Sequence, residues 1–146
     1  MAVELLRTVD CLEYAGSEPR LPALQVRVRE LIFGREKALT APIDTGYAGY
    51  LLVSREVYSQ IGTMELPQED FGVYSTMAGS ITLRRAEVRL HIGQMELDTF
   101  IETPTHGIGK TLLGRRILHE LDLALLGGKQ KCCHLLPSRT GPNTKT

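Results

Sequence analysis

The sequence predicts a mainly antiparallel β domain with one helix in its C-terminal half. Apolar and polar residues alternate with a period of two over several segments, as half-buried strands require. Segments rich in glycine and other turn residues separate these stretches. Only residues 114–123 carry apolar side chains at convincing helical spacing. The chain has 146 residues, which is the length of one domain.

The first two strands are predicted on either side of a turn at residues 34–37. In LQVRVRE, residues 24–30, the apolar side chains share one face, and the alternation resumes over residues 39–43. This pattern predicts a hairpin that carries Asp44 to the end of a strand. Pro42 cannot donate to a sheet ladder, which places it at an edge or a bulge.

The middle of the chain predicts four more strands, two of them as the arms of a hairpin. The nearly continuous apolar run YLLVS, residues 50–54, is typical of a strand that is buried on both faces. Residues 56–70 give a mixed signal, with one helical turn as an interpretation of REVYSQIG. A long hairpin is predicted over residues 71–93, with Met-Ala-Gly-Ser at residues 77–80 as its tip. The segment MELDTFIET, residues 95–103, returns as another strand.

The C-terminal part predicts a helix and a last strand. In GRRILHELDL, residues 114–123, three apolar residues share one face, and a Gly-Gly pair offers a stop. KCCHLL, residues 131–136, is interpreted as a strand that could contribute to a dimer sheet, and the final PSRTGPNTKT as a disordered end. We therefore expect one domain over residues 1–128, followed by a C-terminal strand and tail over residues 129–146.

Charge and cysteine content exclude several classes of protein. Seventeen basic residues balance seventeen acidic ones, so no electrostatic footprint predicts nucleic acid or an anionic membrane as a partner. No signal peptide and no apolar stretch of about 20 residues is visible. An odd count of three cysteines, two of them adjacent, predicts reduced thiols in a cytoplasmic protein. Cys132, Cys133 and His134 lack a second ligand pair at zinc spacing, so no metal is expected.

The segment HGIGKTLLG contains Gly-Lys-Thr, the ending of a phosphate-binding loop. That loop also requires a glycine five residues before Gly109, because its backbone N–H groups surround the phosphate. Pro104 stands there and has no N–H to donate. Nucleotide binding is therefore not expected.

Asp44-Thr45-Gly46 is the strongest candidate for chemistry. The triplet lies between two apolar strands and not in a polar hairpin turn, so its carboxylate is carried towards the interior. A buried carboxylate must find hydrogen-bond donors or share a proton. Gly46 permits a tight turn of the backbone, and the small hydroxyl of Thr45 can brace it.

With these segments in place, the chain resembles the aspartic peptidases of the retropepsin type, the retroviral-like members of clan AA, in which each subunit contributes one Asp-Thr/Ser-Gly. Residues 43–46 resemble the catalytic loop, and the hairpin with its tip at residues 77–80 resembles the flap. Residues 111–115, Thr-Leu-Leu-Gly-Arg, are similar to the family's hydrophobic–hydrophobic–Gly segment behind that loop. The resemblance covers about residues 20–128 and implies a closed, barrel-like antiparallel acid-protease fold in a single-lobe subunit.

The resemblance implies a homodimeric aspartic endopeptidase that acts on a peptide or unfolded protein and needs no metal or organic cofactor. Asp44 of each subunit would act as general acid and base. The other implied site residues are Thr45 and Gly46 in the active-site loop, Met77, Ala78 and Gly79 as flap contacts, and Leu112, Leu113 and Gly114 as loop support.

Tyr47 departs from the usual pattern, because retropepsins place Ala or Ser directly after the triplet. An aromatic side chain beside the carboxylate would narrow the site or turn away from it. Bacterial and archaeal predicted peptidases of this group also carry an aromatic residue there, and the chain resembles them in this respect. Two alternatives stay open: a retropepsin-fold domain that binds peptide or only dimerises, with weak or no activity, and an unrelated small β domain with a structural triplet.

Overall fold

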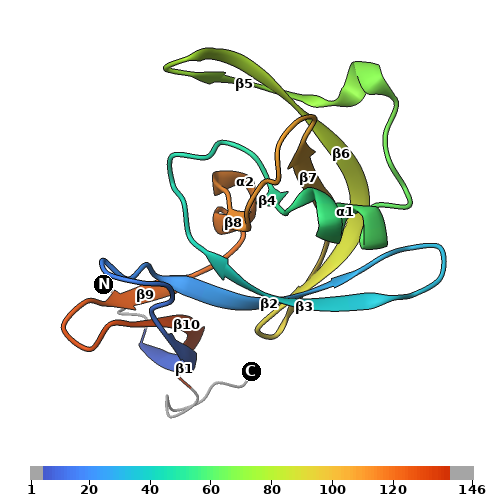
Figure 1. The fold of residues 1–146 in the computed structure, drawn as a ribbon. Coiled ribbons are helices and arrows are strands. Elements are labelled where there is room, and N and C mark those ends of the chain that lie inside the picture. Colours follow the sequence, from blue (N-terminus) through green and yellow to red (C-terminus); the bar gives the residue numbers. More distant parts are fainter. Residues whose placement is uncertain (1–4, 139–146) are drawn as a thin grey trace, which may run out of the picture.

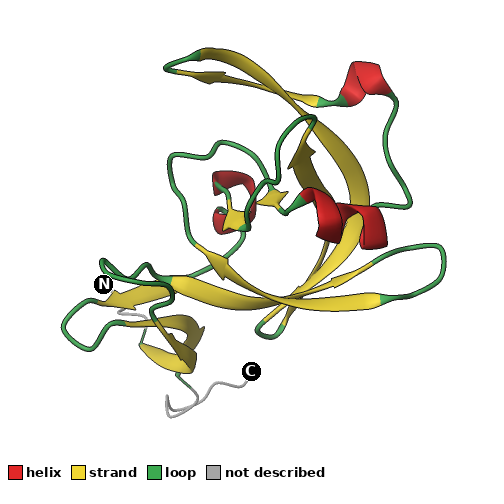
Figure 2. Cartoon of the chain, in the orientation of Figure 1, coloured by secondary structure: helices red, strands yellow, loops and turns green. Residues whose placement is uncertain are grey.

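The computed structural model describes residues 5–138 and arranges their strands in two sheets (Figures 1 and 2). The expectation of a mainly β fold is confirmed. The larger sheet has seven strands: β2 (Ala23–Arg29), β3 (Glu36–Pro42), β4 (Leu51–Leu52), β5 (Gly72–Thr76), β6 (Gly79–Ile92), β7 (Met95–Pro104) and β8 (Leu112–Leu113). The smaller sheet has three: β1 (Leu6–Glu13), β9 (Leu123–Leu126) and β10 (Lys131–Pro137). The helices are α1 (Arg55–Ile61), the short 3₁₀ helix η1 (Gln68–Asp70) and α2 (Arg115–Leu118).

Both predicted hairpins are present. β2 pairs with β3 in antiparallel register, and its alternating apolar side chains Leu24, Val26 and Val28 are buried in the core. β5 pairs with the first part of β6, whose later part pairs with β7 and β2. The end of this hairpin, formed by β5 and the first part of β6, therefore projects beyond the rest of the sheet (Figure 1).

The larger sheet is open, so the expected closed barrel is not confirmed. Its strands follow the order β3-β2-β6-β7-β4-β8, with β5 added to β6. β3 and β8 are the two ends, and a single parallel bridge between Ile43 and Leu113 connects the residues beyond β3 to β8. Pro42 is the last residue of the edge strand β3, as its missing donor requires.

The strand expected at residues 50–54 is reduced to β4, which pairs in parallel with β7 and antiparallel with β8. Leu51 and Val53 are fully buried, whereas Leu52 is only half-buried. The interpretation of REVYSQIG as helical is confirmed by α1, which is capped by Ser54, whose hydroxyl accepts a hydrogen bond from the Val57 backbone N–H at 3.1 Å.

The helix expected over residues 114–123 is wrong in its extent. α2 ends at Leu118, and Leu123–Leu126 form β9, which pairs antiparallel with β10. The apolar face was nevertheless assigned correctly, because Ile117 is buried and Leu121 packs against the core. Pairing with a strand that lies further along the chain thus overrides the local helical spacing.

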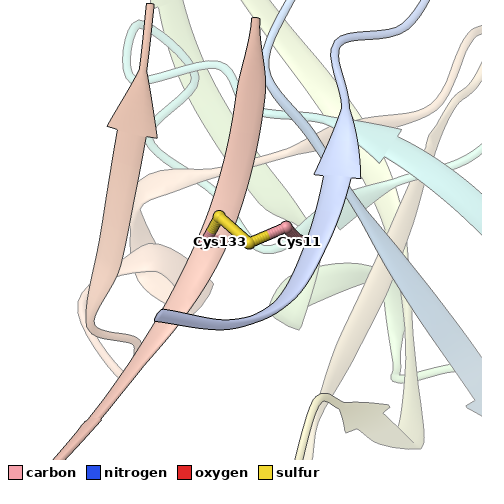
Figure 3. The surroundings of a disulfide bond; sticks show 2 residues. All are labelled: Cys11 and Cys133. Carbon is pink, nitrogen blue, oxygen red and sulfur yellow. A yellow bond between two sulfur atoms is a disulfide. The ribbon is translucent and has the colours of Figure 1, made fainter. Parts of the chain in front are cut away.

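The smaller sheet corrects two expectations about the cysteines and the last strand. β10 is the central strand, paired with β1 on one side and β9 on the other, so it offers no free edge to a dimer sheet. A bulge in β1 between Val9 and Leu12 places Cys11 against Cys133, and the two form a disulfide (Figure 3). The expectation of reduced thiols is therefore wrong for this pair, although Cys132 stays free and buried.

Because disulfides persist in oxidising compartments, cysteine usage no longer supports a cytoplasmic location. No helix within residues 5–138 is long and apolar enough to span a membrane. The disordered end expected from Pro137 onward falls, for residues 139–146, outside the described residues.

Replacing Cys11 with Ser should lower the free energy of unfolding by about 2–4 kcal/mol, because the disulfide closes a long loop in the unfolded chain. The two cysteines are separated by 122 positions in the sequence. Urea denaturation with and without a thiol reductant measures the effect. Reductant should lower the free energy of unfolding of the native protein to that of the Cys11→Ser variant. It should leave the free energy of unfolding of the variant unchanged. Equal stability of the native protein in both conditions would show that the pair does not stabilise the fold.

Candidate active site

Asp44 lies on a short loop directly after β3. Its backbone N–H donates to the Leu113 carbonyl at 3.0 Å, and its Oδ1 accepts a hydrogen bond from the Gly46 N–H at 2.9 Å. Asp44 is half-buried, while Thr45 and Gly46 are exposed. The carboxylate therefore orders its own loop and still reaches the surface of this chain.

The segment from Leu112 to Arg116 supports this loop from behind. The Gly114 N–H donates to the Tyr50 carbonyl at 2.7 Å, and the Arg115 N–H donates to the Tyr47 carbonyl at 2.9 Å. A Cβ on Gly114 would overlap the Gly49 carbonyl oxygen and lie 2.7 Å from the Gly49 carbonyl carbon. Leu113 and Gly114 thus contact the Asp44 loop through their backbones, and only a glycine permits the approach at residue 114.

A cavity of about 560 Å³ opens beside Asp44. Asp44, Gly46 and Tyr47 line it from the loop, and Arg115 is the other charged residue in its wall. Most of the remaining wall is apolar: Ala48, Leu52, Ile81, Leu83, Pro104 and Leu112. The cavity is therefore suited to an apolar side chain held next to a carboxylate.

The β5–β6 hairpin forms one side of this cavity, but not through its tip. Met77 is fully exposed, Ala78 is exposed, and Gly79 begins β6 with a φ of 114°, which favours glycine. These three residues do not line the cavity, whereas Thr76 and Ile81, from the adjacent strand positions, do. Of the residues predicted from the sequence, the structure brings Asp44, Gly46 and Leu112 together at one cavity.

Glu102, near the end of β7, belongs to the site, although no sequence motif predicts it. Its side chain is fully buried and accepts hydrogen bonds from the Tyr47 hydroxyl, from the Tyr50 N–H at 3.1 Å and from the Tyr74 hydroxyl at 2.6 Å. Arg85 forms an ion pair with it, with Nη2 3.0 Å from Oε2. The available signal was one acidic residue inside the apolar strand segment FIET, because a buried charge needs partners.

The partners of Glu102 have shifted pKa values. Burial, with the charge and hydrogen bond of Glu102, raises the pKa of Tyr47 above its ordinary value, and the same causes raise the pKa of Tyr74. Burial alone would lower the pKa of Arg85, but the charge and hydrogen bonds of Glu102 raise it overall. Both phenols are therefore protonated donors and Arg85 is charged over the physiological range.

Tyr47 points its hydroxyl toward the interior and still lines the cavity beside Asp44. Its hydroxyl donates to Glu102, and its ring packs edge to face against Tyr74 with 5.7 Å between ring centroids.

Among residues 5–138, no group of three or more His, Cys, Asp or Glu side chains is arranged to hold a metal ion.

Gly114→Ala should destabilise the protein by about 2–3 kcal/mol, because the new methyl group meets backbone atoms that cannot rotate away. Gly127→Ala is the matched control, since a Cβ there has no heavy atom within 4 Å. It should change stability by no more than about 0.5 kcal/mol. Thermal or urea unfolding of both variants measures the difference. Equal stability of the two variants would contradict the close packing at Gly114.

Comparison with known proteins gives a fold relationship without a sequence relationship. No protein-family model matches the chain, and no curated protein matches it in sequence. Among solved structures, the chain is similar to EIAV protease in complex with the inhibitor HBY-793, with a TM-score of 0.52 and 15% sequence identity. The similarity covers 73% of this chain and 92% of the EIAV protease chain. The chain therefore has a retropepsin-like fold.

Proposed function

We propose that the protein is an aspartic endopeptidase that hydrolyses peptide bonds as a homodimer. The observation that carries the proposal is the position of Asp44. It lies on a glycine-containing loop, backed by Leu113 and Gly114, at a mostly apolar cavity that a projecting hairpin borders. The retropepsin-like fold is consistent with this assignment, and the site chemistry supports it independently.

The mechanism requires two facing carboxyl groups that share one proton. One carboxylate removes a proton from water as the water oxygen bonds to the peptide carbonyl carbon, and the other carboxylic acid donates its proton to the carbonyl oxygen. The tetrahedral intermediate then breaks the C–N bond, and a proton passes to the leaving amine. This chain has one Asp-Thr-Gly, so the second Asp44 comes from a second copy related by a two-fold axis.

The loop is suited to a facing copy of itself. Thr45 and Gly46 are exposed next to the half-buried Asp44, so a second loop can approach them. In the dimer, Thr45 braces the two loops against each other, and the Gly46 backbone stays close to substrate and water. This arrangement places the two Asp44 carboxylates across the axis.

The substrate binds as an extended strand under the β5–β6 hairpin. Thr76 and Ile81 lie at the cavity and contact the bound peptide there. Met77, Ala78 and Gly79, exposed at the tip, contact the substrate as the hairpin closes and excludes bulk water. The orientation of Tyr47 is compatible with a peptidase, because its hydroxyl donates to the buried Glu102.

Asp44→Asn should reduce cleavage of an unstructured protein at mildly acidic pH by at least about 100-fold, because the amide cannot exchange the required proton. Asp122→Asn is the matched control: its side chain is exposed outside the cavity, and the variant should cleave at the native rate. Initial rates of fragment release measure both. Native-like cleavage by the Asp44→Asn variant would refute the assignment of Asp44.

Mixing subunits tests whether the site is shared between two chains. With equal amounts of native and Asp44→Asn chains and free exchange, about one quarter of the dimers carry two Asp44 residues, so activity per native chain falls by about half. Mixing with the Asp122→Asn variant should leave the activity per native chain unchanged. Sedimentation analysis of the same samples reports the dimer. Unchanged activity in the Asp44→Asn mixture, despite subunit exchange, would show that each chain acts alone.

A further inference from the structure

Two separate parts of the proposed site meet at the carboxylate of Glu102. Oε1 accepts hydrogen bonds from the active-site loop, from the Tyr47 hydroxyl and the Tyr50 N–H. Oε2 accepts from the hairpin, from the Tyr74 hydroxyl of β5 and from Arg85 of β6. Each oxygen therefore serves a different part of the site.

Both parts approach the carboxylate through a glycine. A Cβ on Gly49 of the loop would overlap Oε1, and a Cβ on Gly72 at the start of β5 would overlap Oε2. A side chain at either position would require the Glu102 carboxylate to shift. The loop and the hairpin are therefore both shaped around Glu102.

Glu102 also determines two walls of the cavity beside Asp44. Tyr47 and Tyr74 line that cavity, contact each other edge to face, and donate their hydroxyls to the same carboxylate. Glu102 itself is fully buried and does not line the cavity. It can act on the site only through the groups that donate to it, and these two tyrosines are the ones that line the cavity.

We propose that Glu102 is a positioning residue that connects the Asp44 loop to the β5–β6 hairpin, so that the position of the loop and the position of the hairpin depend on each other. Hydrogen bonds to a charged, buried acceptor are the strong ones, and five donors from three segments converge here. The proposal rests on the proposed function, because its consequence is the alignment of the cavity walls and the reacting carboxylate.

Two isosteric variants separate the loop side from the hairpin side. Tyr74→Phe removes one donor to Oε2 and should raise KM for a peptide substrate roughly tenfold with little change in kcat, because β5 loses its hydrogen bond to Glu102 and only Arg85 of β6 still holds the hairpin to it. Tyr47→Phe removes one donor to Oε1 and should lower kcat by a similar factor with little change in KM, because the Asp44 loop then keeps only the Tyr50 N–H as a hydrogen bond to Glu102.

Tyr58→Phe is the matched control, because the Tyr58 hydroxyl also donates to a carboxylate, Oε2 of Glu65, at 2.8 Å. Tyr58 does not line the cavity, so this variant should lose stability and keep both kinetic constants. Tyr47→Phe and Tyr74→Phe variants that lose only stability, as the control does, would overturn the positioning role.

Hydrogen exchange measured by mass spectrometry tests the same connection without substrate. In the Tyr74→Phe variant, the amides of residues 44–50 should exchange roughly tenfold faster, although the substitution lies in β5, and in Tyr58→Phe they should not. Native exchange in that segment would overturn the inference. Faster exchange in a protein that cleaves no peptide would support the connection and count against the proposed function alone.

Discussion

The burial of one carboxylate determines much of the geometry around the site. Glu102 is fully enclosed in β7, and a buried charge without partners would cost several kcal/mol. Its side-chain partners come from the loop after β3, from β5 and from β6, and they lie 55, 28 and 17 positions from it in the sequence. The hydrogen bonds and the ion pair that the buried Glu102 carboxylate requires therefore order the same segments that surround Asp44.

Close backbone packing supplies the second constraint. Gly114 lies against the Gly49 carbonyl, and consecutive N–H groups after β8 donate to carbonyls of residues 47–50. The carboxylate of Glu102 contacts that loop from the other side, through Tyr47 and the Tyr50 N–H. The Asp44 loop is thus fixed by backbone bonds on one side and by a buried charge on the other, and neither constraint depends on Asp44 itself.

The sequence predicts what depends on local pattern and misses what depends on distant partners. Period-two alternation gave both hairpins, because the pleat imposes that spacing on any half-buried strand. Residues 123–126 formed a strand because β10, further along the chain, paired with them, and Cys11 found Cys133 only through the bulge in β1. Asp44 was recognisable from its triplet, whereas Glu102 has no sequence motif and its partners become neighbours only in the folded chain.

The order within the Asp44 loop of one chain has a consequence for the proposed dimer. A site divided between two chains must be ordered before or during association, and ordering during association reduces the affinity of the two chains. Here the loop is held by Leu113, Gly114 and Glu102 of its own chain. In the proposed dimer, association has only to bring two ordered loops together at Asp44, Thr45 and Gly46. The exposed part of the loop is therefore the part that the proposed dimer covers, and the buried part is complete within one chain.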